Sequence, residues 1–354
     1  MDELAELIGI RSTADRPADL RRALDMVLGL VGPGFEVRRF ESRGKPSALV
    51  STPGPPRVIL NAHLDVVPGA PGQFTARADG HRLYGRGAHD MKAAALVMAT
   101  VFREVAPTLP YPVALQLVTD EEVGGFDGTG HQVAQGVRAG FVIIGEQSGL
   151  RIVTESKGII RARLTATGRT AHAAYPWLGS NALLTVTAAV RRLLDRHPVP
   201  AAEEWTTTVN VARIETSNEA ANVVPADASA LVDIRFPPSE EDLAGRPADE
   251  IAAHLTAVSG AVVTVEALGA PHHADPESAE VRLLRRAARE AGYDGSLLRK
   301  HGAADGRFYS AVGVDAVIFG PGGDGQHGPE EFVDLRTLPP YRKALEGFLK
   351  GLGG

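Results

Sequence analysis

Apolar runs that alternate with helical periods dominate the first 155 residues. Apolar positions at helical spacing occur between residues 3 and 30, over Met91–Val105 and over Thr129–Gln135. Short apolar or alternating runs typical of strands occupy residues 35–40, 48–51, 58–63, 113–118, 141–144 and 152–155. Strands of this kind separated by helices predict an α/β fold with a central, mainly parallel sheet and helices on both faces.

The pattern changes between residues 158 and 268. Strand-like runs at 159–167, 206–214, 229–236 and 262–268 alternate with helical periods at 181–195 and 248–258. This β-α-β-β-α-β order predicts a ferredoxin-like α+β domain. Helices over 279–291 and 337–352 and a strand at 316–319 then resume the α/β pattern. We therefore predict one domain in two parts, residues 1–157 and 269–354, with residues 158–268 inserted.

Composition narrows the classes of protein that the chain can represent. It has 354 residues, 44% hydrophobic and 23% charged, with a net charge of −6, which argues against nucleic acid or an anionic membrane as a partner. It has no cysteine, which excludes disulfides, thiolate metal sites and cysteine nucleophiles. The acidic opening MDELAELIGI has no basic leader and no apolar run is long enough to span a bilayer, so we expect a cytoplasmic protein.

Titratable residues follow several predicted strands. His63 and Asp65 end the apolar run of VILNAHLDVVPG. If the strand continues, residues two apart share a face, and a metal-bound imidazole normally donates its other N–H to a carboxylate. A histidine that caps a strand end, with Asp65 in a turn, is the alternative interpretation.

Five more acidic or imidazole side chains occur in similar positions. Asp90 lies where the glycine-rich loop of YGRGAHDMK meets a helix, although an aspartate there also suits a helix N-cap. Glu121 and Glu122 follow the strand of LVTDEEVGG, where adjacent carboxylates repel unless a cation or solvent screens them. Glu146 and His327 follow two further apolar strands, in GEQSG and in a glycine loop; a surface acid and a loop histidine are the alternatives.

Together these strand ends predict a metal centre at one edge of the sheet. Two imidazoles and three carboxylates, divided over two cations with one bridging carboxylate, leave each cation an open position, as in catalytic rather than structural sites. Nitrogen and oxygen ligands favour zinc, with cobalt or manganese as alternatives. The predicted ligands are His63, Asp90, Glu122, Glu146 and His327.

The motifs HLDVVPG, GRGAHDMK, TDEEVGG, GEQ and GRTAHAAYP together resemble the M20 family of metallopeptidases. That group includes acetylornithine deacetylase, succinyl-diaminopimelate desuccinylase, aminoacylase and glutamate carboxypeptidase. The resemblance covers nearly the whole chain. It implies a catalytic domain carrying two zinc ions and an inserted lid domain through which two copies dimerise.

The resemblance also implies a role for each matching residue. His63, Asp90 and Glu146 would hold one zinc, and Asp90, Glu122 and His327 the other. Asp65 would orient His63, Glu121 would be the general base, and the Asp90–Met91 peptide bond would be cis. In the inserted domain, His172 would stabilise the oxyanion, and Arg235 and Asn222 would contact the substrate, with Arg307 and Gly302 as further substrate contacts. Without the resemblance, a surface histidine, an arginine in an ion pair and a turn asparagine are the simpler interpretations.

The function implied is removal of an acyl group from an N-acyl amino acid by a metal-activated water molecule, with Glu121 as the base. A metallo-exopeptidase acting on short peptides is the alternative on the same scaffold. A catalytically silent metal-binding regulatory protein is a third interpretation, disfavoured because every ligand and base position is filled. Sequence motifs do not identify the acyl group, since one methylene changes selectivity by only ~1–3 kcal/mol.

Overall fold

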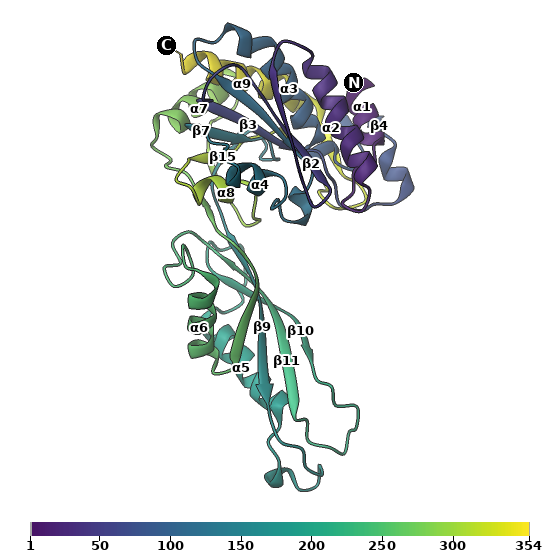
Figure 1. Ribbon diagram of the computed structural model, residues 1–354, viewed down its shortest axis with the longest axis vertical. Coiled ribbons are helices and arrows are strands. Elements are labelled where there is room, and N and C mark those ends of the chain that lie inside the picture. The colour runs from purple at the N-terminus through teal and green to yellow at the C-terminus, as the bar shows by residue number, and fades with distance from the viewer. Residues whose placement is uncertain (1, 354) are drawn as a thin grey trace. The chain divides into compact units, whose positions relative to one another are not determined.

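A computed structural model describes residues 2–353. The chain divides into two compact units (Figure 1). The first comprises the chain up to Thr154, His273–Arg299 and the chain from Ala304 onward. The second comprises Glu155–His272 and the short segment Lys300–Ala303. The chain passes from one unit to the other near the ends of β8, β13 and β14, whose bounds follow.

A large sheet forms the centre of the first unit. In spatial order it contains β1 (Glu36–Ser42), β2 (Lys45–Ser51), β6 (Val113–Val118), β3 (Val58–His63), β7 (Phe141–Ile144), β15 (Ala316–Ile318), β8 (Ile152–Ser156) and β13 (His272–His273), and β14 (Leu297–Lys300) pairs with β8. The four central strands β6, β3, β7 and β15 are parallel, whereas β1, β2 and β8 run antiparallel to their neighbours. The predicted parallel sheet is confirmed at its centre.

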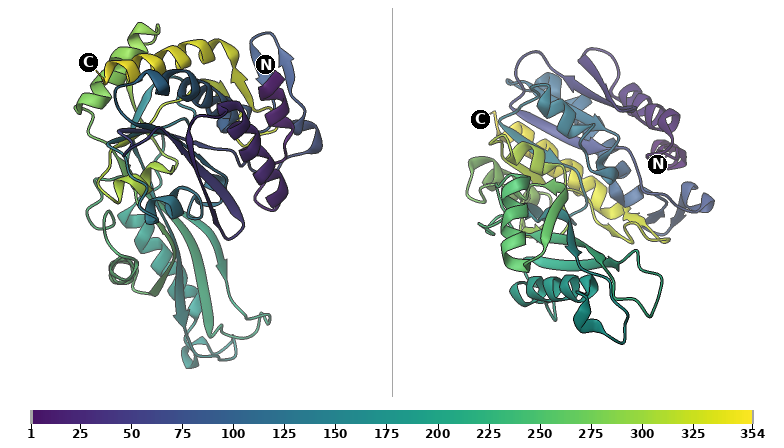
Figure 2. Two further views of the ribbon diagram at one scale, coloured as in Figure 1. Left: turned by 45° about the horizontal axis from the view of Figure 1, so that its top comes forward. Right: turned by 60° about the horizontal axis from the view of Figure 1, so that its bottom comes forward.

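Helices cover both faces of this sheet (Figures 1 and 2). On one face lie α1 (Asp2–Gly9), α2 (Pro17–Val31), α3 (Ala93–Val105), α7 (Ala279–Glu290) and α9 (Leu338–Gly351); on the other lie α4 (Thr129–Ala134) and α8 (Gly306–Ser310). Strand residues alternate between the two cores: Val58 and Leu60 pack with the first group and Ile59 with the second. Burial on both faces explains why β3 is an unbroken apolar run.

The first unit also contains a smaller antiparallel sheet, which the sequence analysis did not predict. It contains β16 (Gly323–Asp324), β17 (Phe332–Asp334), β5 (Arg82–Tyr84) and β4 (Arg77–Asp79), in that order. The pairing of Phe332 with Tyr84 brings together two segments separated by about 250 residues of chain. Single turns complete the unit: η1 (Pro71–Phe74), η2 (Ala88–Lys92), η3 (Ala106–Thr108), η4 (Glu121–Val123) and η6 (Leu335–Thr337).

The second unit has the predicted β-α-β-β-α-β order. Its elements are β9 (Gly158–Thr167), η5 (Pro176–Leu178), α5 (Ala182–Arg196), β10 (Thr208–Glu215), β11 (Asp227–Phe236), α6 (Ala248–Ser259) and β12 (Val262–Gly269). The four strands form an antiparallel sheet in the order β10-β11-β9-β12. Alternate residues of β11, such as Ala230, Val232 and Ile234, pack against α5 and α6. This is the ferredoxin-like arrangement expected from the sequence.

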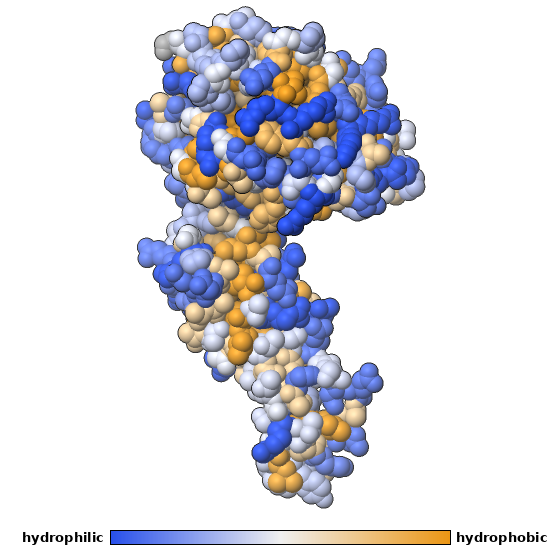
Figure 3. Space-filling model, in the orientation of Figure 1, coloured by the Kyte–Doolittle hydropathy of each residue, from blue (hydrophilic) through white to orange (hydrophobic). Residues whose placement is uncertain are grey.

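The molecular surface is mainly hydrophilic on the face shown in Figure 3, with apolar areas on each unit. Among residues 2–353, no helix combines the length and the apolar character that crossing a membrane requires.

A buried polar network lies between the large sheet and α4 and α8. Gln116, in the middle of β6, accepts hydrogen bonds from Asn61 (2.7 Å) and from the hydroxyl of Tyr309 (2.7 Å), and donates to Gln132 (3.0 Å). The Asn61 amide also lies 3.1 Å from the hydroxyl of Thr129. Because all five side chains are buried, each needs its partner inside the protein.

We predict that Gln116→Leu destabilises the protein more than removal of any one of its partners. The variant leaves donors of Asn61 and Tyr309 and an acceptor of Gln132 unpaired, each at a cost of about 1–3 kcal/mol. Tyr309→Phe removes one hydrogen bond and is expected to cost about 1 kcal/mol. Urea unfolding of both variants measures the two free energies. Equal midpoints for Gln116→Leu and the parent protein would show that the network does not stabilise the fold.

Candidate metal centre

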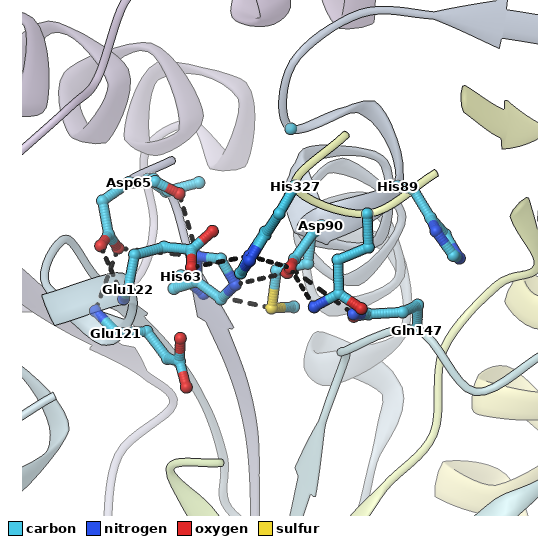
Figure 4. A network of polar contacts seen from close by, with 12 residues as sticks. His63, Asp65, His89, Asp90, Glu121, Glu122, Gln147 and His327 are labelled. Carbon is cyan, nitrogen blue, oxygen red and sulfur yellow. Dashed lines mark hydrogen bonds and ion pairs between the residues drawn. The ribbon is translucent and has the colours of Figure 1, made fainter. Parts of the chain in front are cut away.

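Six titratable side chains converge at the carboxyl ends of the central strands. Figure 4 labels all of them except Glu146. They fall into two groups, His63 with Glu121 and Glu146, and Asp90 with Glu122 and His327. Within each group, one ligand atom from each side chain lies within 4.8 Å of the others. The structure thus brings together all five residues that the sequence analysis proposed as ligands, together with the proposed base.

The parallel strands account for four of these six side chains. His63 is the last residue of β3, Glu121 and Glu122 form η4 just beyond β6, and Glu146 follows β7 by two residues. Since β6, β3 and β7 are parallel neighbours, their carboxyl ends share one edge of the sheet. A β-carbon at position 145, just before Glu146, would lie 2.8 Å from the methyl group of Met91, so the glycine leaves room for that side chain.

The remaining ligands come from outside the parallel strands. Asp90 lies in the irregular turn η2 before α3, and its peptide bond to Met91 is cis, as the resemblance implied. His327 follows the strand at 316–318 and a glycine loop, in the order that the sequence predicted. It lies in the hairpin between β16 and β17 of the small sheet, with a left-handed backbone (φ 61°).

Asp90 occupies the centre of the site. One of its carboxylate oxygens lies 3.0 Å from Nε2 of His63, and the other lies 3.3 Å from Nε2 of His327. The amide of Gln326 donates to the second oxygen at 2.7 Å, and that of Gln147 lies 3.5 Å away. His327 also lies 3.0 Å from Glu122. A carboxylate directed at two imidazoles has the geometry required to bridge two cations.

Asp65 stabilises the site through contacts that strand alternation did not predict. It lies beyond the end of β3, and its carbonyl oxygen, rather than its carboxylate, is within 3.0 Å of Nδ1 of His63. The carboxylate lies 3.6 Å from that nitrogen and accepts the backbone N–H groups of Glu121 (3.2 Å) and Glu122 (3.0 Å). Asp65 therefore fixes both the imidazole and the turn that carries the two glutamates.

Burial and the crowding of like charges shift the pKa values of these groups. Burial, and then the charge of Asp90, raise the pKa of Glu122 to about 7. Burial, and then Glu146, raise the pKa of Glu121 well above its usual value. Burial lowers the pKa of His63, but Asp65 and Asp90 raise it more, so that it stands well above 6.5. Bound cations would relieve this repulsion, so the donor set fits divalent metal ions.

Several residues that support the site were not found in the sequence. The carboxylate of Glu331 accepts the backbone N–H groups of His89 and Asp90, each at 3.1 Å, and pairs with Arg86. Asp305 is buried behind the glutamate turn and accepts a hydrogen bond from Thr129, and burial raises its pKa to about 7. Neither Glu331 nor Asp305 follows a long apolar run, so the hydrophobic pattern did not indicate either residue as part of the site. His89, to which no role was given, points away from the cluster in Figure 4.

Arg307 and Gly302, two of the proposed substrate contacts, belong to neither group of candidate metal ligands. Arg307 donates to the carbonyl of Gly124 and packs over the rings of Phe126 (5.5 Å) and Phe308 (4.8 Å), so its fork supports the loop after Glu122. Gly302 belongs to the second unit and has no left-handed backbone.

His172, Asn222 and Arg235 also belong to the second unit. His172 and Asn222 are exposed, and the Asn222 carbonyl accepts the N–H of Ala173 at 2.9 Å. Arg235 pairs through two nitrogens with Asp233 on the same strand, at 2.6 and 3.3 Å. Its guanidinium is thus engaged within β11, and a substrate carboxylate would compete with Asp233.

Fold and site together define a metal-dependent hydrolase. Residues 59–351 match the family model described as peptidase family M20/M25/M40. The chain belongs to this family.

The relatives of this chain are described by several different activities. The chain is 28% identical over 326 residues to a succinyl-diaminopimelate desuccinylase of Albidiferax ferrireducens, covering 83% of this chain and 81% of that protein. It is 31% identical over 325 residues to a probable carboxypeptidase of Aspergillus terreus, covering 83% and 70%. Among solved structures, a tripeptidase from Staphylococcus aureus shares the fold with a TM-score of 0.80 at 20% identity, covering 99% and 97% of the two chains.

The pKa shifts predict how the metal-free protein responds to pH. Glu122 and Asp305 have a folded pKa of about 7 against usual values of 4.5 and 3.8, so the native state binds more protons than the unfolded state in this interval. The free energy of unfolding should therefore fall as pH rises from about 5 to about 7.5. The raised pKa of His63 acts in the same direction, because its contribution is lost as pH rises through the folded value.

Thermal unfolding of chelator-treated protein across this range measures the effect. Glu122→Gln should flatten the dependence, since it removes one of the carboxylates with a raised pKa. Added Zn²⁺ should reverse the loss at pH 7.5. Stability that rises with pH in the metal-free protein would contradict the charge crowding described above.

Proposed function

We propose that the protein is a dinuclear metal-dependent amide hydrolase that removes the acyl group from an N-acyl amino acid. The observation that carries this proposal is the position of Asp90 between His63 and His327, with each carboxylate oxygen directed at one imidazole. With one oxygen near each imidazole, Asp90 would be a ligand to both cations of such a centre.

The ligand set that we propose has Asp90 as a member of both sites. His63 and Glu146 complete the first site, and Glu122 and His327 complete the second. Nitrogen and oxygen donors without sulfur favour zinc, with cobalt or manganese as alternatives. When bound, the two cations would polarise the scissile carbonyl and acidify a water molecule.

Glu121 is the general base in this proposal. Its carboxylate reaches the space shared by His63 and Glu146. Its backbone is fixed by Asp65, so the side chain is held where it can take a proton from the attacking water. It would then pass that proton to the leaving amine.

The second unit supplies the remaining functions in this proposal. We propose that residues 158–268 act as a lid and dimerisation domain, in which His172 stabilises the oxyanion, and Asn222 and Arg235 contact the substrate. Exposed apolar side chains support a role in assembly, with Trp177 72%, Leu178 59% and Leu184 69% exposed. Such side chains favour burial against another surface.

A metallo-exopeptidase acting on short peptides is the second candidate. It is favoured by the probable carboxypeptidase relative, which shares 31% identity with this chain, slightly more than the desuccinylase. Both candidates hydrolyse an amide bond with the same groups and differ only in the parts of the substrate that flank it.

We predict that Glu121→Gln abolishes turnover while both cations remain bound. Loss of a general base costs 10²–10⁴-fold in kcat, and the amide keeps the shape of the carboxylate. Metal analysis after dialysis and steady-state kinetics measure the two properties. His327→Ala is the matched comparison, because it should lose one cation as well as activity. If Glu121→Gln loses a cation, Glu121 is a ligand, as its grouping with His63 and Glu146 would also allow.

A substrate panel separates the two candidate functions. N-acetyl-ornithine, N-succinyl-diaminopimelate, other N-acyl amino acids and dipeptides, each with added Zn²⁺ or Co²⁺, should include one compound with kcat/KM at least tenfold above the rest. The N-acyl amino acids are expected to be preferred. Arg235→Met should raise KM for substrates with a free carboxylate. Cleavage of dipeptides alone supports the exopeptidase, and cleavage of no compound with both cations bound contradicts both candidates.

A further inference from the structure

The two proposed ligands Asp90 and His327 lie on irregular segments and not at the ends of the parallel strands. Asp90 lies in an irregular turn, and His327 lies at a hairpin tip between glycines 325 and 328. The His327 side chain is 49% exposed, whereas that of His63 is 2% exposed. Packing in the hydrophobic core therefore positions His63 but does not position His327.

A buried ion pair joins these two segments. Nη1 of Arg86 lies 2.6 Å from the carboxylate of Glu331, and the two side chains are 3% and 1% exposed. Arg86 precedes Asp90 by four residues, and Glu331 follows His327 by four. The small sheet sets this meeting, because Tyr84 pairs with Phe332 and the N–H of Gly85 donates to the carbonyl of Glu331 at 3.0 Å.

Each partner of the pair also holds the segment that carries the other. One oxygen of Glu331 accepts the N–H groups of His89 and Asp90 at 3.1 Å, and the second accepts that of Gly87 at 3.0 Å. Nη2 of Arg86 donates to the carbonyls of His327 and Gly328, both at 3.1 Å. The pair is thus bonded directly to the backbone of both ligand residues.

We propose that Arg86 and Glu331 are positioning residues that set the separation of Asp90 and His327, and with it the affinity of the second cation site. A glutamate alone could cap the turn, and an arginine alone could hold the hairpin. Only the pair fixes one relative to the other, because the planar guanidinium reaches the carboxylate and the two carbonyls at once. This inference rests on the proposed two-cation centre but not on any particular substrate.

The test must separate positioning from simple loss of stability. Arg86→Met leaves the Glu331 charge buried and unpaired, which destabilises any fold. The double variant Arg86→Met/Glu331→Leu removes both charges and replaces them with apolar side chains of similar size, so its thermal stability should recover toward that of the parent protein. The hydrogen bonds to the two ligand segments remain absent.

Titration of the metal-free protein with Co²⁺, followed by visible absorption and calorimetry, gives the two dissociation constants without any substrate. The double variant should bind the first cation nearly as the parent does, and the second 10–100-fold more weakly, as for other residues that support ligands. Arg86→Lys should keep the charge pair and most of the stability but still weaken the second site, since one ammonium cannot replace the fork.

A matched control is Arg138→Met, because Arg138 also donates to two backbone carbonyls, those of Val133 and Val137, away from the ligand segments. Both dissociation constants should be unchanged in this variant. Parent-like affinities in the stable double variant would overturn the proposal, as would a parent protein that binds only one cation. A weakened second site in a protein that cleaves none of the panel would sustain the positioning role while refuting the proposed function.

Discussion

The carboxylates gathered at one edge of the large sheet repel one another, and the fold of the first unit must overcome this repulsion. Asp90, Glu121, Glu122 and Glu146 lie around the same small space. Carboxylates brought together in a partly buried site resist ionisation, and the pKa of Glu122 at about 7 reflects this cost. The fold maintains the arrangement because the parallel strands that carry three of the segments are secured by burial on both faces of the sheet.

The protein treats its acidic side chains in two ways. Asp65 and Glu331 face backbone N–H groups, which satisfy their charge and leave them as structural anchors. Glu121 and Glu122 receive no such donors from the backbone in the described chain and are directed into the site. A carboxylate that the protein does not neutralise itself is available to a cation or to a proton. This division distinguishes the supporting residues from those proposed to hold a cation or move a proton, although both kinds are acidic.

Sequence pattern identified the parts of the fold that long-range burial dictates. The strand at 58–63 was predicted with the bounds that the structure shows. The ends of the two helices in the inserted domain were each predicted to within one residue. The small sheet was missed because strands of two or three residues, such as β16 and β5, carry no measurable periodicity. The Arg86–Glu331 pair was missed for the same reason, since residues 245 positions apart meet only through that sheet. Asp65 was identified, but its carboxylate binds the glutamate turn, a contact that depends on how two loops meet.

The two proposed cation sites would rest on different kinds of support, and this would let one centre serve relatives with different activities. His63 and Glu146 follow neighbouring parallel strands, so their positions come from the core itself. His327 comes from a hairpin whose position depends on one ion pair and a few backbone hydrogen bonds. In the proposed function, the core-supported half would fix the reaction class, which the desuccinylase and carboxypeptidase relatives would share. Changes in pocket residues around it alter selectivity by only ~1–3 kcal/mol per methylene. The proposed metal centre would therefore specify amide hydrolysis, and the substrate would be specified by side chains that need not touch a cation.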